Sequence, residues 1–256
     1  MGILNITPDS FYDGGSYFTL IDQLKQVEKM ISEGALIIDI GAISTRPGAT
    51  QLTEEQEIAR LLPSLIPIRK YFTEIVISVD TFRTSVAKAA IENGAMMIND
   101  IFGGRFDGGM FSLVANHNIP YVLMHMQGEP DNMQINPHYV DVVNEIHEFF
   151  HTRIDLLPKG FEQVILDPGF GFGKTVKDNF QILQHLESFS SFGFPLLAGL
   201  SRKSMINRVL HIKPQEALNG TTVLNTITLL KGANILRVHD VKEAMEAIKL
   251  VRTMEQ

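Results

Sequence analysis

Short apolar runs recur along the chain, and each one follows a glycine and ends at a polar residue or a further glycine. Five segments share this plan; residues 34–39 read Gly-Ala-Leu-Ile-Ile-Asp, and residues 232–237 read Gly-Ala-Asn-Ile-Leu-Arg. Glycine closes a helix readily because it enters the left-handed backbone region without the steric penalty of a Cβ atom. Apolar runs that do not alternate with polar residues are typical of strands buried on both faces. Each segment therefore predicts a helix end followed by a buried parallel strand.

Three more apolar runs, at residues 2–5, 75–80 and 121–124, bring the predicted strands to eight. Apolar residues at helical spacing occupy the intervals, and the first stripe begins after Thr19, whose hydroxyl suits an N-cap. Eight strand–helix units in a chain of this length predict an α/β fold, a single (β/α)8 TIM barrel over residues 1–256. The main alternative, a doubly wound sheet, more often has about six strands. The first stripe consists of Leu20, Leu24, Val27 and Ile31.

Polar residues stand where the predicted strands end. In a barrel of parallel strands the carboxyl ends of all strands meet on one face, where active sites are built. We therefore expect a functional site at this mouth of the barrel. The strand-end residues are Asn5, Asp39, Asp80, Asn99, His125, Asp167, Ser201 and Arg237.

A net charge of −7 and the absence of cysteine narrow the function. Nucleic acid favours a basic surface, so the charge argues against a nucleic-acid partner, although a few converging cations could still bind a small anion. Without cysteine the chain forms no disulfide and has no thiol nucleophile. No apolar run approaches the roughly 18 residues that span a bilayer, and no basic leader opens the sequence. We expect a cytoplasmic protein with no membrane partner.

Two other motifs suggest different chemistry but fit their context poorly. Residues 169–175 read Gly-Phe-Gly-Phe-Gly-Lys-Thr, yet a phosphate-binding loop of the Walker type requires glycine where Pro168 stands. His147 and His151 have zinc-protease spacing, but their predicted helix belongs to the outer ring, away from the barrel mouth. We expect His147 to be a partly buried packing residue, and we expect neither motif to bind nucleotide or zinc.

Several blocks of sequence resemble the signatures of the dihydropteroate synthase family. They begin with Gly-Ile-Leu-Asn-Ile-Thr-Pro-Asp-Ser-Phe at residues 2–11 and Ser-Thr-Arg-Pro-Gly at residues 44–48. Further blocks start at Asp167, Ser201 and Arg237, in the family's order over nearly the whole chain. The resemblance implies a transferase of folate biosynthesis, a sulfonamide target, which joins 6-hydroxymethyl-7,8-dihydropterin pyrophosphate to 4-aminobenzoate. It also implies Mg²⁺ as cofactor and a homodimer.

The resemblance assigns the pterin to the strand ends. A pterin presents a guanidine-like edge that a carboxylate can accept in bidentate fashion, and Asp167 is the candidate acceptor. Lys203 is expected to donate to the carbonyl edge, while Met124 and Phe170 pack against the ring. The full pterin-binding set is Asp80, Asn99, Met124, Asp167, Phe170, Gly199 and Lys203.

By the same resemblance, a separate set of residues binds the pyrophosphate. Arg237 and His239 stand two residues apart at the exit of the last predicted strand and therefore point to the same side. Thr45 and Arg46 complete this set. Asn5 is expected to help hold Mg²⁺ against the pyrophosphate, because magnesium takes few protein oxygens and bridges phosphates.

The implied reaction is substitution at the pterin CH₂ group, in which pyrophosphate departs before the amine attacks. The dihydropterin can delocalise the resulting positive charge, so no covalent enzyme intermediate is needed. Asp13 is expected to stabilise this cation, and the catalytic set is Asp13, Thr45, Arg46 and Lys203. The expected pocket for 4-aminobenzoate consists of Phe11, Pro47, Phe170, Ser201 and Lys203.

The residues leave alternatives open. Ala42 stands where the family usually has a second glycine, and Phe102 is bulkier than the small residue expected there. A pterin-binding methyltransferase would share the pterin contacts but would not need the anion-binding set. A non-catalytic pterin-binding paralogue would be expected to lose Lys203, Asn5 or Arg237, and all three are present. An aldolase barrel would need a lysine within a strand, and no predicted strand contains one.

Overall fold

The structure is a computed structural model that describes residues 1–7, 19–43 and 52–254. Strands and helices alternate through these residues, as the glycine-closed segments predict. The strands are β1 (Gly2–Asn5), β2 (Ile37–Gly41), β3 (Val76–Asp80), β4 (Met97–Asp100), β5 (Tyr121–Met124), β6 (Val164–Asp167), β7 (Leu197–Ala198) and β8 (Ile235–Leu236). The helices are α1 (Leu20–Ser32), α2 (Glu54–Tyr71), α3 (Thr84–Glu92), α4 (Met110–His117), α5 (Val142–Asp155), α6 (Val176–Gln184), α7 (Ser204–Leu210), α8 (Leu218–Leu230) and α9 (Val241–Met254), with short 3₁₀ segments η1 (Leu186–Phe192) and η2 (Pro214–Glu216).

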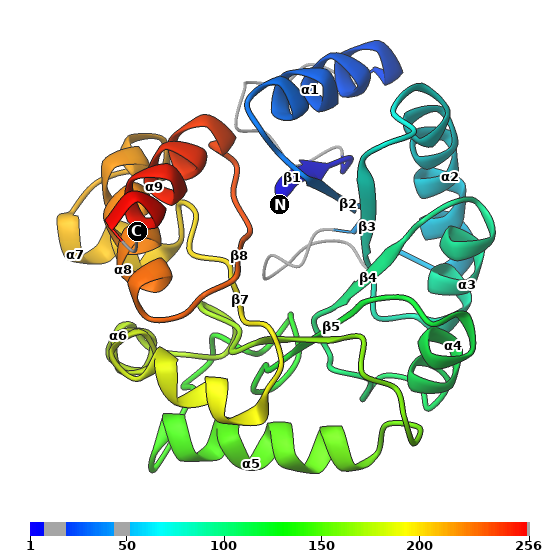
Figure 1. The fold of residues 1–256 in the computed structure, drawn as a ribbon. Helices are drawn as coiled ribbons and strands as arrows, with labels where there is room; N and C mark the ends of the chain where they lie inside the picture. The colour runs from blue at the N-terminus through cyan, green and yellow to red at the C-terminus, as the bar shows by residue number, and fades with distance from the viewer. Residues whose placement is uncertain (8–18, 44–51, 255–256) are drawn as a thin grey trace.

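The strands close into a ring. β1 to β6 form one parallel sheet in chain order, and β7 pairs with β8 in a second. Isolated parallel bridges join the sheets at both edges, between Leu166 and Leu196 and between Gly2 and Val238. The backbone N–H of Ile3 also donates to the carbonyl of Val238 over 3.0 Å. Helices surround the strands (Figure 1), so the predicted α/β barrel is confirmed.

Threonine N-caps begin several helices. Thr19, Thr53 and Thr175 each accept a hydrogen bond from the backbone N–H three residues on, and the side chain at that position accepts from the threonine N–H in return. These capping boxes satisfy donors that the first helical turn leaves without partners. The N-cap predicted at Thr19 is confirmed. The stripe behind it is only partly buried, since Val27 is 0% exposed whereas Leu20 is 39% exposed.

Apolar side chains pack on both sides of the ring. The main cluster joins strand residues such as Ile38 and Ile77 to helix residues such as Val27 and Leu61. Since side chains alternate along a strand, the neighbours of Ile38 and Ile77 face the barrel interior. A separate interior cluster consists of Met1, Ile37, Val76, Met97, Val122, Ile165, Leu197 and Ile235. Within the described residues, no helix combines the length and apolar character that crossing a membrane requires.

Candidate active site

Strand alternation places the site directly above the interior apolar cluster. Residues two apart on a strand share a face, so the residue two positions after each member of the cluster also points inward. This layer lies toward the carboxyl ends of the strands, where barrel active sites form. It consists of Ile3, Asp39, Ser78, Asn99, Met124, Asp167, Gly199 and Arg237.

Arg237 joins the Asp39 carboxylate of this layer to the carboxylate of Asp80 at the end of β3. Its Nε donates to Asp39 Oδ2 over 2.7 Å, and its Nη2 donates to Asp80 Oδ2 over 2.8 Å. The fully buried Asp39 also accepts from Ser78 Oγ at 2.6 Å and from Asn99 Nδ2 at 3.1 Å. Burial raises the pKa of Asp80 to about 7, while the charge of Arg237 opposes the rise. These contacts connect β2, β3 and β4 with the exit of β8.

The ends of β6 and β7 contribute a second carboxylate and an ammonium group. Asp167 is 5% exposed and accepts a hydrogen bond from the Gly169 N–H at 2.7 Å. Burial raises the pKa of Asp167, and the charge of Lys203 opposes this rise. Burial lowers the pKa of Lys203 to about 8, so the ammonium form still prevails at neutral pH. Lys203 donates to the carbonyl of Phe170, and its Nζ lies 4.6 Å from the centre of the Phe172 ring.

The loop after β6 wraps around the buried Lys174. Its Nζ donates to the carbonyls of Gly169 at 2.9 Å and Phe172 at 3.0 Å, and lies 3.0 Å from His125 Nδ1. Burial, reinforced by Lys174, lowers the pKa of His125 well below its usual value, so the imidazole is neutral and its Nδ1 can accept. Gly169 has a φ of 71°, and a Cβ there would lie 1.9 Å from the His125 carbonyl oxygen. Glycine is therefore required at this turn, and Lys174 is committed to the main chain of its own loop.

The turn after β7 presents Ser201 and Lys203 on either side of a residue in the left-handed region. Arg202 has a φ of 55°, a conformation that costs a non-glycine residue about 1–2 kcal/mol. Its guanidinium makes two hydrogen bonds to the Asp240 carboxylate, at 2.8 and 2.6 Å. Ser201 Oγ lies 3.0 Å from His239 Nδ1. Burial lowers the pKa of His239 to about 4, so this imidazole is neutral at pH 7.

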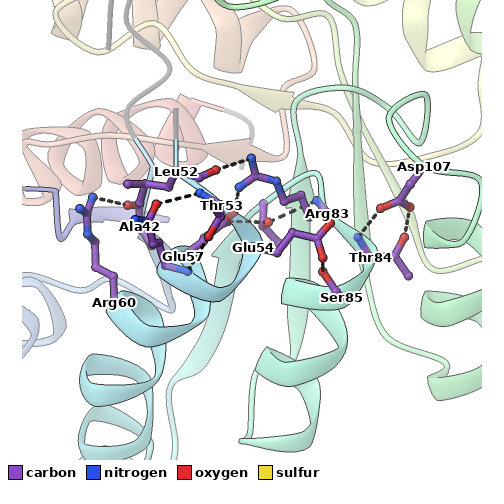
Figure 2. A network of polar contacts seen from close by, with 12 residues as sticks. Ala42, Leu52, Thr53, Glu54, Glu57, Arg60, Arg83, Thr84, Ser85 and Asp107 are labelled. Carbon is purple, nitrogen blue, oxygen red and sulfur yellow. Dashed lines mark hydrogen bonds and ion pairs between the residues drawn. The ribbon is translucent and has the colours of Figure 1, made fainter. Parts of the chain in front are cut away.

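A second buried network joins α2 to the turn before α3 (Figure 2). Arg83 Nη1 donates to Glu57 Oε2 at 2.5 Å, and the side chains of Arg83 and Glu57 are only 9% and 1% exposed. Arg83 Nη2 donates to the Leu52 carbonyl at 2.7 Å. From α2, Arg60 Nη1 donates to the Ala42 carbonyl at 3.0 Å. The main chain is thus anchored at Ala42 and at Leu52, on either side of the second signature block.

Comparison with known proteins assigns the chain to a family. Residues 1–239 match the family of pterin binding enzymes. The chain is 44% identical over 254 residues to the dihydropteroate synthase of Escherichia coli K12, covering 98% of this chain and 89% of that protein. It is 43% identical over 256 residues to the dihydropteroate synthase of Bacillus subtilis, covering 99% of this chain and 87% of that one. The chain belongs to the dihydropteroate synthase family.

Solved structures in the family have the same fold. The Yersinia pestis dihydropteroate synthase, in complex with a sulfonamide drug, matches with a TM-score of 0.94 at 42% identity, covering 99% of this chain and 93% of that one. The Clostridium difficile dihydropteroate synthase, in the presence of pteroic acid, matches with a TM-score of 0.90 at 35% identity, covering 99% and 95%. The family inferred from the sequence blocks, a transferase family of folate biosynthesis, is therefore confirmed.

The described part of the chain brings most of the family-derived binding residues together. Hydrogen bonds or charge interactions link Asp80, Asp167, Lys203 and Arg237 in one cluster. Gly199 adjoins it, since a Cβ there would lie 3.9 Å from both Lys203 Nζ and Arg237 Cβ. The expectations for the first two signature loops concern residues outside the described part, namely Phe11, Asp13, Thr45, Arg46 and Pro47.

Two phenylalanines in the loop after β6, Phe170 and Phe172, lie in different environments, and the Phe170 ring is not where the sequence predicts it. The Phe170 ring is 0% exposed in the main core, and only its carbonyl reaches Lys203. The positive-φ glycines on either side turn this side chain inward. Phe172 instead packs against the cluster that contains Met124, and its ring lies next to the Lys203 ammonium. The structure therefore buries the Phe170 side chain in the core, and it brings the Phe172 side chain next to Lys203 and the cluster that contains Met124.

Two polar residues of the inward layer have contacts that the sequence did not predict. Asp39 was expected only as a strand end, and Ser78 was not identified, although a serine inside an otherwise apolar strand is itself a signal of a buried polar contact. The expected packing role of His147 is confirmed, since its ring stacks at 4.7 Å on Phe189 and its Nε2 lies 2.9 Å from Ser188 Oγ. In the described chain, no three His, Cys, Asp or Glu side chains are arranged to hold a metal ion.

Phe102, one of the two departures from the family pattern, fits into an aromatic cluster. Its ring centre lies 4.5 Å from that of Phe82 and 5.6 Å from that of Phe106. Arg83 lies over the Phe82 ring at 5.2 Å. The large Phe102 side chain is thus accommodated in an aromatic cluster that lies next to the Glu57–Arg83 network.

Proposed function

We propose that this chain condenses 6-hydroxymethyl-7,8-dihydropterin pyrophosphate with 4-aminobenzoate, giving 7,8-dihydropteroate and pyrophosphate. The observation that carries the proposal is a set of complementary groups: the carboxylate of Asp167 and the amide of Asn99 in the inward layer, and the ammonium of Lys203 from the turn after β7. A pterin offers hydrogen-bond donors on one edge and acceptors on another. Membership of the dihydropteroate synthase family supports this ligand over others that a barrel mouth could hold.

The pterin is held by matching polar edges. The buried Asp167 carboxylate accepts from the guanidine-like edge, and Lys203, protonated at neutral pH, donates to the carbonyl edge. Asn99 and Asp80 complete the polar contacts, while Met124 and Phe172 supply apolar surface for the ring. A buried polar group without a partner costs about 1–3 kcal/mol, so this site rejects heterocycles that lack the matching groups.

The pyrophosphate group is bound by Arg237 and His239, together with Thr45 and Arg46. Mg²⁺ fits next to Asn5, because the space beside Gly41 is lined by oxygen atoms. A Cβ on Gly41 would lie 3.2 Å from Asn5 Oδ1 and 4.0 Å from Asp80 Oδ2. Magnesium suits sites with few protein oxygens and a phosphate ligand. When bound, it would neutralise charge on the departing pyrophosphate.

The chemistry is substitution at the pterin CH₂ carbon. The bond from this carbon to the pyrophosphate oxygen breaks, and pyrophosphate leaves with the electron pair. The 4-aminobenzoate nitrogen then forms the new C–N bond and releases a proton. Asp13 stabilises the cationic pterin, and Lys203 and Ser201 border the amine pocket, with Phe11 and Pro47 as its predicted wall. The working enzyme is proposed to be a cytoplasmic homodimer.

The test is pyrophosphate release from the dihydropterin pyrophosphate with Mg²⁺, measured with and without 4-aminobenzoate. We expect release to require the amine and to fall at least about 100-fold in Asp167→Asn and Lys203→Ala, because each change removes a charged contact to the ring. Lys88→Ala, at an exposed position of α3, is the matched control and should keep full activity. Pterin binding without release would favour a non-catalytic pterin binder. A folded protein that neither binds nor turns over the pterin would refute the proposal.

A further inference from the structure

Asp39 is the most highly connected buried carboxylate of the site. One oxygen accepts from Ser78 Oγ at 2.6 Å, and the other accepts from Asn99 Nδ2 at 3.1 Å and Arg237 Nε at 2.7 Å. Its side chain has 0% exposure. A carboxylate without accessible surface cannot contact a ligand itself, so any effect on binding must pass through Asn99 or Arg237.

The Asp39 carboxylate fixes the orientation of the Asn99 amide. A carboxylate only accepts hydrogen bonds, so the amide nitrogen must face Asp39 and the amide oxygen must face away. Asn99 is 3% exposed, and its Oδ1 has no hydrogen-bond partner among the described residues. A buried acceptor without a donor is unfavourable, and in native proteins it calls for a specific explanation. A ligand N–H directed at Oδ1 supplies the missing donor.

Asp39 also holds one edge of the Arg237 guanidinium. Nε is bound by Asp39 and Nη2 by Asp80, which fixes the plane of the group and directs its remaining N–H donors elsewhere. Ser78 in turn restrains Asp39 from the neighbouring strand. The contacts thus form a chain from Ser78 through Asp39 to two groups that reach the inward face.

We propose that Asp39 is a positioning residue that makes Asn99 Oδ1 an acceptor for a pterin ring N–H and presets Arg237 for the pyrophosphate. The inference rests on the proposed function, since it concerns the same site. The competing view is that Asp39 only stabilises the barrel as the buried partner of Arg237. The two views differ in one respect: a positioning effect on the pterin disappears when Asn99 is removed, whereas a structural effect persists.

The experiment is a double-mutant cycle on binding, without turnover. Affinity for 6-hydroxymethyl-7,8-dihydropterin, which lacks phosphate, is measured by calorimetry for wild type, Asp39→Asn, Asn99→Ala and the double variant. We expect Asp39→Asn to weaken binding about tenfold in the wild-type background and less than about twofold in the Asn99→Ala background, because coupled residues are not additive. The same cycle is repeated with the pyrophosphate ester as the probe. Asp39→Asn should then weaken binding in both backgrounds, because the ester also contacts Arg237.

Two further variants separate positioning from folding. Ser78→Ala removes one restraint on Asp39 but no charge, and we expect a loss of about threefold that also vanishes with Asn99→Ala. Tyr121→Phe removes a 2.6 Å buried hydrogen bond to Asp100 on the same sheet and should leave pterin affinity unchanged. This control is matched for loss of a buried polar contact away from Asp39.

The outcomes are distinct. Failure of the wild-type protein to bind either pterin would overturn the proposed function and the role of Asp39 with it. Normal wild-type binding with unchanged affinity in folded Asp39→Asn would overturn the positioning role alone. Equal losses in both backgrounds would also overturn it, in favour of a structural ion pair. If Asp39→Asn fails to fold, the Ser78→Ala cycle decides on the same criterion.

Discussion

Removal of one member of the Glu57–Arg83 pair should destabilise the barrel far more than removal of both. The pair joins α2 to the turn before α3, with side chains that are 1% and 9% exposed (Figure 2). Breaking a buried ion pair from one side leaves an uncompensated charge, which costs about 3–5 kcal/mol. We expect Glu57→Leu and Arg83→Met each to lower the free energy of unfolding by about that amount.

The double variant Glu57→Leu/Arg83→Met buries no charge. It leaves only the Thr81 hydroxyl, which donates to Glu57 at 2.7 Å, and the Leu52 carbonyl, which accepts from Arg83 at 2.7 Å. At about 1 kcal/mol for each lost hydrogen bond, the double variant should cost roughly 2 kcal/mol. Urea unfolding with linear extrapolation measures the free energy of unfolding of the wild type, the two single variants and the double variant. A double variant as unstable as the sum of the two single ones would refute the reasoning, because it would mean that the two charges do not interact.

Three other expectations follow from the site. Since Lys203 acts as an ammonium ion and its pKa is lowered to about 8, kcat/KM for the pterin should fall as pH rises through 8, which a pH–rate profile measures. Gly169→Ala should lower the free energy of unfolding by more than about 3 kcal/mol. The added Cβ would lie 1.9 Å from the His125 carbonyl oxygen, and the positive φ adds backbone strain. Gly160→Ala, with a φ of 80° and no atom within 4 Å, should cost only about 1–2 kcal/mol. Removal of Mg²⁺ with a chelator should abolish pyrophosphate release but leave affinity for the phosphate-free pterin unchanged, whereas loss of both would argue against a magnesium site at Asn5.

The positions of the strands could be predicted because buried parallel strands combine apolar runs with a glycine at the preceding helix end. The predicted run at residues 121–124 coincides with β5, and that at residues 2–5 with β1. The region between β7 and β8 was less predictable, because it contains two helices rather than one. α7 has only seven residues, too few for a clear period, and it packs so closely on α8 that a Cβ on Gly220 would lie 2.4 Å from Ile206 Cγ2.

The site was predictable as a set of strand ends but not as a set of contacts. Alternation places Asp167 and Arg237 on the inner face, yet nothing in their spacing shows that Arg237 is held by Asp39, 198 residues away in the sequence. The choice between Phe170 and Phe172 depends on the backbone path through positive-φ glycines, which a linear motif does not encode. The Glu57–Arg83 pair connects two outer helical units, and helical periodicity carries no information on polar partners in another helix.

The arrangement of charge explains why the proposed reaction needs cations beyond those of the strand ends. Arg237 and Lys203 face three carboxylates, those of Asp39, Asp80 and Asp167, so these five groups sum to −1 when all are ionised. The carboxylates suit the cationic character of a guanidine-like pterin edge, but they repel a pyrophosphate and already hold Arg237. Opposite charges at such distances interact strongly in a buried site, so Arg237 is only partly available to the leaving group. We propose that the compensating charge comes from Mg²⁺ next to Asn5 and from Arg46 of the second signature block. On this proposal, the groups that select the pterin also create the need for a metal ion that offsets their negative charge.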